Sequence, residues 1–338
     1  MQRSRRDFLK LASAGAIAAG LPLSPRAGRG QPAAKIGTAV LGDYAMAGPV
    51  IVALDRGYFK ENGLDAEFIP FRGGPDLLKA VIGGEPLIGI TGGTDIFVFR
   101  EAGAPIKMVA TETEGNHFTL NVAADIHTVG DLRGKAIGVT RVGATTWVFA
   151  RILARQNGWD PERDVKIVAL GGLDAQVAAL ARHEIQAIVW GDGGAVLEAQ
   201  GKSKVLKRLD SVTPKWISQI VYASEETIRK RPDDIRKALR GIFQALAFMT
   251  QHTAEAAAIA AKTMKWDPQA VLAAHKLSSP LFPKDGSIDV AALRMMQDTL
   301  LEQGVLARRQ PLEEHYTTAF TPVRVSRGAH SRAPSRRC

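Results

Sequence analysis

The sequence predicts an α/β fold built from two similar lobes. Its 338 residues are enough for about two domains of ordinary size. Before residue 225, short apolar runs typical of buried strands alternate with helical segments, which indicates sheets with mostly parallel strands. A local pattern also recurs, because Gly73-Gly74-Pro75-Asp76 is matched by Gly171-Gly172-Leu173-Asp174, 98 positions later. Two copies predict two lobes rather than a repeat array.

Eight apolar runs are predicted to be strands. They cover residues 36–41, 66–71, 87–91, 106–111, 118–123, 136–140, 165–170 and 185–190. Helices are expected over residues 49–61, 76–82 and 145–156, because these segments end at Asn62-Gly63, Gly83-Gly84 and Asn157-Gly158. From residue 225 to residue 304 the pattern is helical almost throughout, which argues against a closed barrel of alternating strands and helices.

Composition and charge exclude several classes of protein. Hydrophobic residues make up 46% and charged residues 23%, which is not the composition of a disordered, collagen-like or polytopic membrane chain. The net charge of +10 lies in residues 1–30 and 323–338, while the chain between them is balanced, so nucleic acid is not an expected partner. The single cysteine, Cys338, excludes an intramolecular disulfide and thiol chemistry in the core.

The first residues are typical of an export signal. Ser4, Arg5, Arg6 and Lys10 precede an apolar run that is too short to span a bilayer comfortably, the pattern of a twin-arginine signal peptide. Residues 1–33 are therefore predicted to be this signal and its c-region, although no clear cleavage motif is present. The prediction places the protein in the periplasm, with the twin-arginine translocase as a partner. The alternative is an accidental basic start before an apolar helix.

Two α/β lobes leave a cleft between them, and the loops that follow the strands are expected to line it. Glycines in these loops let the backbone approach a ligand, although tight turns alone would also explain them. Candidate ligand-binding residues follow from their places at strand ends and helix starts: Tyr44, Arg72, Gly73, Gly74, Thr91, Gly92, Thr94, His117, Arg141, Thr145, Thr146, Trp190 and Asp192.

The charges near these loops predict the sign of the ligand. Arg72 and Arg141 follow strands in the two lobes and favour an anion such as a carboxylate, nitrate or sulfonate, unless they are only solvated surface residues. Asp43, Asp192 and Glu114 favour a zwitterion or a neutral heterocycle if they line the same cleft. For the threonines, capping a helix is the simpler role.

No motif of an enzyme is present. The spacing of His117, His127 and His183 does not match any metal-binding motif. The sequence also contains no Walker loop, nucleophile elbow or dinucleotide fingerprint. We therefore expect no catalytic residue, no metal and no cofactor.

An ordered set of motifs indicates a family. The segment 53–64, Gly73-Gly74, Gly84-Glu85 and the segments 102–107, 131–138 and 283–289 together resemble periplasmic solute-binding proteins of nitrate, sulfonate and taurine ABC importers. That family also includes proteins that bind or make the thiamine pyrimidine. The resemblance covers about residues 35 to 323.

The resemblance implies a periplasmic binding protein fold of type II, with two crossings between the lobes. Lobe one would comprise residues 34–123 and 221–323, including a helical C-terminal region packed on it, and lobe two residues 124–220. Crossings are expected near residues 125–127 and 213–216, and residues 324–338 are expected to be a solvated, disordered tail.

The implied function is that of an exported, monomeric solute-binding component that is not an enzyme. It would deliver a small polar solute to an ABC permease in the inner membrane. The alternative is an exported or cytosolic enzyme of the same fold, similar to a pyrimidine synthase or a desulfinating hydrolase. Leu87, Gln186 and Gly193-Gly194 depart from the family's usual Asp, Asp and Pro, so the solute stays open.

The export signal gives the first testable prediction. Changing Arg5→Lys together with Arg6→Lys should leave the protein in the cytoplasm, because the translocase recognises the arginine pair rather than its charge. Immunoblots of periplasmic and cytoplasmic fractions measure this. An unchanged periplasmic yield would contradict the assignment.

Overall fold

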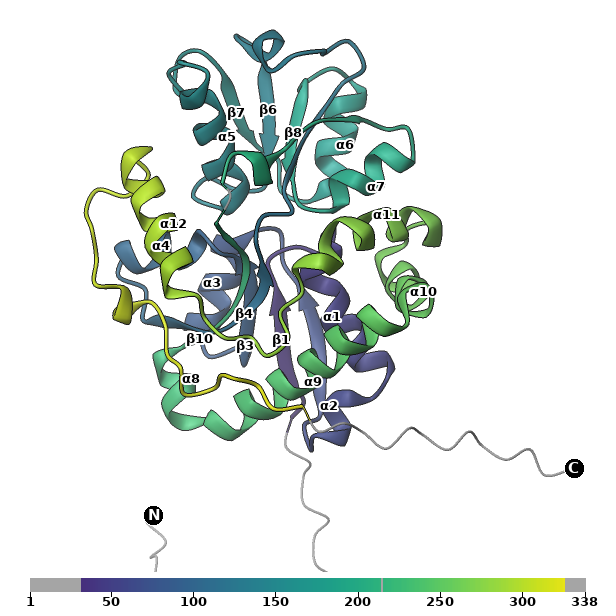
Figure 1. Ribbon diagram of the computed structural model, residues 1–338, viewed down its shortest axis with the longest axis vertical. Coiled ribbons are helices and arrows are strands. Elements are labelled where there is room, and N and C mark those ends of the chain that lie inside the picture. Colours follow the sequence, from purple (N-terminus) through teal and green to yellow (C-terminus); the bar gives the residue numbers. More distant parts are fainter. Residues whose placement is uncertain (1–31, 214, 326–338) are drawn as a thin grey trace, which may run out of the picture. The chain divides into compact units, whose positions relative to one another are not determined.

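The computed structural model describes residues 32–213 and 215–325, which contain two five-stranded sheets (Figure 1). The predicted signal peptide with Arg5 and Arg6 lies outside the described residues, as does the tail from residue 326 onward. Both sheets belong to one compact unit that begins at Ala33. We call each sheet with the helices that follow its strands a lobe, the first lobe being the one that contains β1.

The sheet of the first lobe has the strand order β2-β1-β3-β10-β4. β1 pairs in parallel with β2 and β3, whereas β10 is antiparallel to β3 and β4. The strands are β1 (Ala34–Thr38), β2 (Ala66–Pro70), β3 (Ile88–Gly92), β4 (Ile106–Glu114) and β10 (Ile217–Ser224).

The sheet of the second lobe has the matching order β7-β6-β8-β5-β9. β6 is parallel to β7 and β8, and β5 is antiparallel to β8 and β9. The strands are β5 (Thr119–Val122), β6 (Ala136–Val139), β7 (Lys166–Ala169), β8 (Ala187–Trp190) and β9 (Lys204–Arg208). The prediction of two similar α/β lobes is confirmed.

Both sheets are mixed, but four of the five described strands in each run in the same direction, in agreement with the prediction of mostly parallel sheets, while β10 and β5 run the other way. The strands missing from the prediction, β9 and β10, each form antiparallel pairs. Lys204, Lys207 and Arg208 break the apolar pattern of β9, and Ser218 and Gln219 break that of β10. Ser218 and Gln219 are nevertheless buried, because they serve a polar cluster described below.

The two crossings lie between β4 and β5 and between β9 and β10. The chain leaves the first sheet at Glu114 and enters the second at Thr119, before the crossing expected at residues 125–127. β5 therefore belongs to the second sheet, not to lobe one as the boundary at residue 123 implied. Its sequence reveals a buried strand but not which sheet that strand joins. The return from Arg208 to Ile217 contains the second expected crossing.

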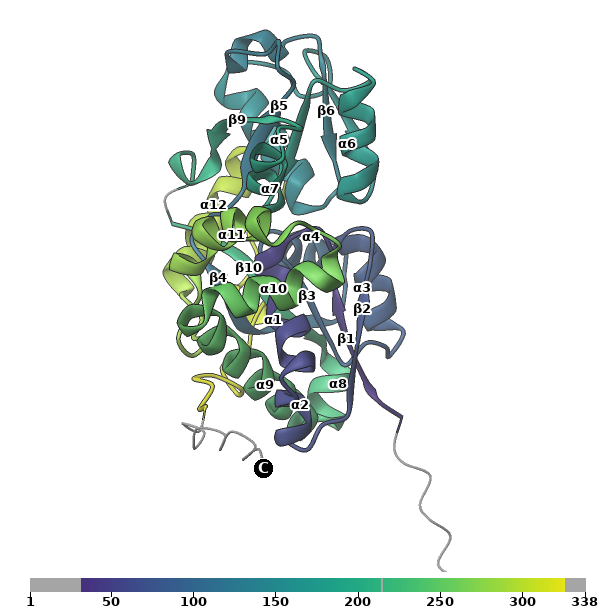
Figure 2. The same cartoon turned by 90° about the vertical axis from the view of Figure 1, so that its right-hand side faces the viewer.

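Helices connect the strands and cover the sheets (Figure 2). α1 begins at Tyr44 and not at Pro49, because the side chain of Asp43 caps it by accepting from the backbone N–H of Met46. Its neighbours are α2 (Tyr58–Glu61), α3 (Gly74–Ile82), α4 (Asp95–Glu101), α5 (Thr145–Gln156), α6 (Leu173–Ala181) and α7 (Gly193–Ala199), with α1 itself spanning Tyr44–Asp55. Short 3₁₀ turns are η1 (Val129–Leu132), η2 (Leu209–Ser211), η3 (Ser279–Leu281) and η4 (Leu312–Glu314).

The C-terminal region is helical, as predicted, and it contacts both lobes. It contains α8 (Glu225–Lys230), α9 (Pro232–Gln251), α10 (Thr253–Met264), α11 (Pro268–Ser278) and α12 (Val290–Glu302). α9 and α10 pack on α1, whereas α11 packs on both α1 and α7 of the second lobe (Figure 1). The expectation of packing on lobe one alone was therefore incomplete. Among the described residues, no helix has the length and apolarity needed to cross a membrane.

A glycine at the end of β3 allows the return crossing to lie close to the first sheet. A Cβ atom on Gly93 would stand 1.9 Å from the carbonyl oxygen of Ile217. The oxygen that this Cβ would meet is a backbone atom, so the contact cannot be relieved by rotating a side chain. This close approach holds the start of β10 against the carboxyl end of β3.

Gly93→Ala should therefore lower the free energy of unfolding by about 1 to 3 kcal/mol, the usual cost of overpacking. Gly130→Ala is the control, because its Cβ would meet only the Thr128 hydroxyl at 3.4 Å. Urea denaturation of both variants measures the difference. Equal stability of the two variants would contradict the close contact.

Candidate functional site

A small cavity lies where the carboxyl ends of strands from both sheets meet. Its volume, counted as space open to the centres of water molecules, is ≈ 30 Å³. It is lined by Ala39, Val40, Asp43, Met46, Gly73, Gly74, Thr91, Gly92, Asp95, Phe118, Thr140, Ala144, Thr145, Thr146, Trp190 and Gly191. These residues follow β1, β2, β3, β6 and β8 or lie on the first crossing, which is the expected place for a ligand in open α/β sheets.

Seven of the thirteen predicted site residues line this cavity. They are Gly73, Gly74, Thr91, Gly92, Thr145, Thr146 and Trp190. Thr94 is buried directly behind the lining, and its Oγ1 donates to Thr145 Oγ1 at 2.7 Å. Tyr44 points elsewhere, because its hydroxyl lies 3.1 Å from Nδ1 of His275 on α11. Whether these residues bind a ligand stays a prediction.

The two arginines do not line the cavity. Arg72 is exposed on the loop after β2. Arg141 is half-buried and pairs with Asp76 of the first lobe, Nη2 to Oδ2 at 3.3 Å, while its side-chain stem lies against Gly73. Of the other charged or titratable candidates, Glu114, His127 and His183 are exposed. The cavity wall therefore carries carboxyl groups but no lysine or arginine.

Asp95 supplies the most polar group of the wall. Its Oδ2 accepts from Thr91 Oγ1 at 2.5 Å and its Oδ1 from Thr145 Oγ1 at 3.1 Å, so a carboxyl of the first lobe bonds to a hydroxyl of the second. Burial raises the pKa of Asp95 to about 7, although these hydrogen bonds partly oppose the shift. Near neutral pH the group can hold or release a proton at the cavity.

Further hydrogen bonds join the lobes beside the cavity. The carboxylate of Asp192, in the second lobe, accepts from the first two backbone N–H groups of α1: Tyr44 at 2.6 Å and Ala45 at 2.8 Å. The indole N–H of Trp190 donates to the carbonyl oxygen of Gly42 at 2.6 Å. These bonds satisfy donors at the start of α1 that have no partner within the helix. The described arrangement is a closed one.

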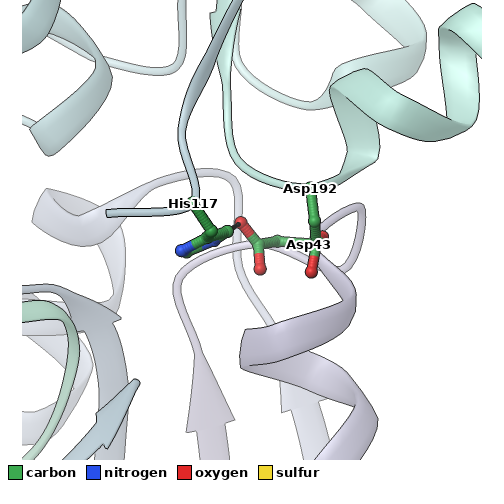
Figure 3. A group of neighbouring side chains, drawn as sticks. All are labelled: Asp43, His117 and Asp192. Atoms are coloured by element: carbon green, nitrogen blue, oxygen red, sulfur yellow. Dashed lines mark hydrogen bonds and ion pairs between the residues drawn. The ribbon is translucent and has the colours of Figure 1, made fainter. Parts of the chain in front are cut away.

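A buried polar cluster lies next to the cavity and contains Asp43, His117 and Asp192 (Figure 3). Nε2 of His117 is 3.1 Å from Oδ2 of Asp43. Nearby carboxylates raise the pKa of His117 even though burial opposes this. Burial, and secondarily Asp43, raise the pKa of Asp192 to about 7. His117 and Asp192 were predicted ligand residues, and the structure places both beside the cavity wall rather than in it.

Sequence reasoning missed several lining residues for identifiable reasons. Met46, Phe118 and Ala144 are apolar and have no distinguishing motif. Asp95, however, follows directly on Thr91-Gly92-Gly93-Thr94 at the end of a strand, so an acidic residue at that place was a usable signal.

The fold is that of periplasmic binding proteins. A family profile described as NMT1/THI5 like matches residues 45–256, which is more than half of the chain. The chain belongs to this NMT1/THI5-like family.

Individual proteins are also similar to this chain. A Brucella abortus protein named as a binding protein, without a solute, is 24% identical over 230 residues that cover 67% of this chain and 70% of the relative. The zinc-bound ligand-binding component of an ABC-type import system from Staphylococcus aureus is 15% identical and has a TM-score of 0.73. The match covers 88% of this chain and 100% of the Staphylococcus aureus chain. The periplasmic aliphatic sulphonate binding protein SsuA of Escherichia coli is 19% identical and has a TM-score of 0.68. The match covers 90% of this chain and 98% of SsuA.

An enzyme also shares the fold. The desulfurization enzyme DSZB has a TM-score of 0.56 at 15% identity, over 85% of this chain and 97% of its own. At these identities, the solved structures establish the fold alone.

The raised pKa of Asp95 predicts a pH dependence of stability. The folded protein binds the proton more tightly than the unfolded chain does, so the free energy of unfolding should fall as the pH rises from 3.8 to about 7. Asp95→Asn should weaken this dependence without abolishing it, because His117 and Asp192 act in the same direction. Urea denaturation across this pH window measures the slope. Asp174→Asn, at an exposed position, is the control and should keep the slope of the parent. Equal slopes for Asp95→Asn and the parent would contradict the raised pKa of Asp95.

Proposed function

We propose that the protein is the solute-binding component of an ABC importer, acting in the periplasm and delivering a small polar solute to a permease. One observation carries this proposal: a buried cavity at the strand ends of two lobes that hydrogen bonds hold together. Such lobes can open about their crossings to admit a solute and close around it.

The polar groups of the wall support a solute that is neutral overall. Asp95 and Asp43 offer hydrogen-bond acceptors on the side of the first lobe. On the other side, α5 begins at Thr145 against the cavity, and its N-cap Ala144 has no side chain to cap it. The backbone N–H groups there attract an acceptor. A zwitterion or a neutral heterocycle meets both demands, whereas a simple anion would face two carboxyl groups.

Aromatic faces support the same class of solute. Phe118 and Trp190 border the cavity from the second lobe and its crossing. Aromatic residues in a lining suit a small planar or methylated group. The expectation of an anion bound by Arg72 and Arg141 has no support from the lining, since Arg72 is exposed and Arg141 pairs with Asp76.

Native mass spectrometry of the freshly purified full chain tests this function, because a retained solute appears as added mass. Ala144→Trp should fill the cavity and reduce the fraction of chains that carry the solute at least about tenfold. Ala181→Trp, on the exposed end of α6, is the matched control and should retain it. Equal retention in both variants would contradict binding in this cavity.

The charge of the solute is tested in the same experiment. Arg72→Ala and Arg141→Ala should retain the solute as the parent does, whereas Asp95→Leu should lose it because a buried hydrogen-bond partner is removed. Loss in the two arginine variants with retention in Asp95→Leu would favour an anion instead.

A further inference from the structure

Three side chains from distant parts of the sequence converge in the polar cluster beside the cavity. Asp43 caps α1 in the first lobe, His117 lies on the first crossing and Asp192 precedes α7 in the second lobe (Figure 3). One oxygen of each carboxylate and one ring nitrogen of the histidine all lie within 4.8 Å of one another. All three residues are at most 2% exposed, unlike the acidic groups that gather on protein surfaces.

The histidine is oriented as a metal-binding histidine is. Its Nδ1 lies 2.7 Å from the hydroxyl of Ser218, which also accepts from the backbone N–H of His117 at 3.3 Å. A hydroxyl can accept a second hydrogen bond, so Ser218 Oγ can accept from an Nδ1–H in the tautomer that leaves the lone pair of Nε2 free for a metal ion. Nε2 points at Oδ2 of Asp43, 3.1 Å away. Two electron-rich atoms at this distance require a cation or a proton between them.

The two carboxylates are also held by outer partners. Oδ1 of Asp43 accepts from the N–H of Met46 and from the amide of Gln219 at 2.8 Å. Asp192 accepts from the start of α1 and, through Oδ2, from the hydroxyl of Ser278 at 2.5 Å. Lone pairs remain on Oδ2 of Asp43 and Oδ1 of Asp192. Such an outer shell of hydrogen bonds is what orients the ligands of metal sites.

The charge in this region favours a divalent cation over a single proton. Burial, and secondarily the charges of Asp43 and Asp192, raise the pKa of Glu112, whose Oε1 has no hydrogen-bond partner among the described residues. One imidazolium cannot balance Asp43 and Asp192 when both are ionised, and unbalanced buried charge is costly. A divalent ion neutralises Asp43 and Asp192 together and leaves His117 neutral.

We propose that Asp43, His117 and Asp192 bind a divalent metal ion of the zinc class at the junction of the two lobes. One nitrogen and two carboxylate oxygens form a donor set that suits zinc, and three protein ligands leave a fourth position for water or a solute group. Asp43 also lines the cavity, so the ion lies at the cavity wall. Since one ligand comes from each lobe and one from a crossing, bound metal stabilises the closed arrangement.

The test is a zinc titration of the full chain after treatment with EDTA, in competition with a chromophoric chelator. We expect one ion per chain with a Kd below about 1 μM near pH 7.5. His117→Gln and Asp192→Asn should each raise this Kd at least about thirtyfold. His183→Gln and Asp174→Asn, two exposed matched controls, should leave it within about threefold. Circular dichroism verifies that each variant is folded.

A second measurement needs no variant. Binding should weaken as the pH falls, because a proton competes with the metal ion for the ring nitrogen of His117, by about tenfold per pH unit while one proton is displaced. Cobalt(II) should give the visible absorption of a four-coordinate site. Absence of saturable binding up to about 100 μM, or an unchanged Kd in folded His117→Gln, would overturn the proposal. Neither outcome affects solute retention in Ala144→Trp and Ala181→Trp, which tests the importer function separately.

Discussion

The carboxylate of Asp192 on the first turn of α1 is the contact on which the closed structure depends. It brings a charged group of the second lobe to the positive end of a helix in the first, where the helix dipole and two free N–H groups stabilise it. The depth of the cavity follows, because Trp190 and Asp43 flank this contact and line the space beside it. The α11 helix completes the arrangement, since Ser278 donates to the same carboxylate.

Elsewhere the lobes meet through the partly exposed ion pair of Arg141 with Asp76 and through hydrogen bonds that involve hydroxyl, indole and backbone groups. Thr94 bonds to Thr145, Thr145 bonds to Asp95, and the Trp190 indole bonds to a backbone carbonyl. Such bonds exchange readily for bonds to water, so each contributes little net free energy to closure. Buried charge between the lobes lies mainly in the cluster of Asp43, His117 and Asp192. The hydrogen bonds around the cluster can therefore break readily when the lobes open. Ions and protons act on the closed state mainly through the buried cluster.

The sequence predicted the repeated lobe architecture and the loops that line the cavity. Gly73-Gly74 and Thr91-Gly92 lie there because only short residues let two lobes approach at strand ends, and that constraint is local and visible. Which groups pair across the lobes is not local. Arg141 was expected to face a ligand, but its partner is Asp76, 65 residues earlier. The sheet joined by β5 and the meeting of Asp43 with His117 likewise follow from tertiary packing, which no spacing in the chain reveals.

The cavity of ≈ 30 Å³ has a kinetic consequence. The residues that line that space are all buried, so a solute can enter only a conformer in which the lobes have separated. The measured affinity is then the intrinsic affinity of the open form multiplied by the fraction of molecules that are open. Association would be limited by the frequency of opening rather than by diffusion. Substitutions that loosen the Asp192 contact would speed capture while leaving every atom that touches the solute unchanged.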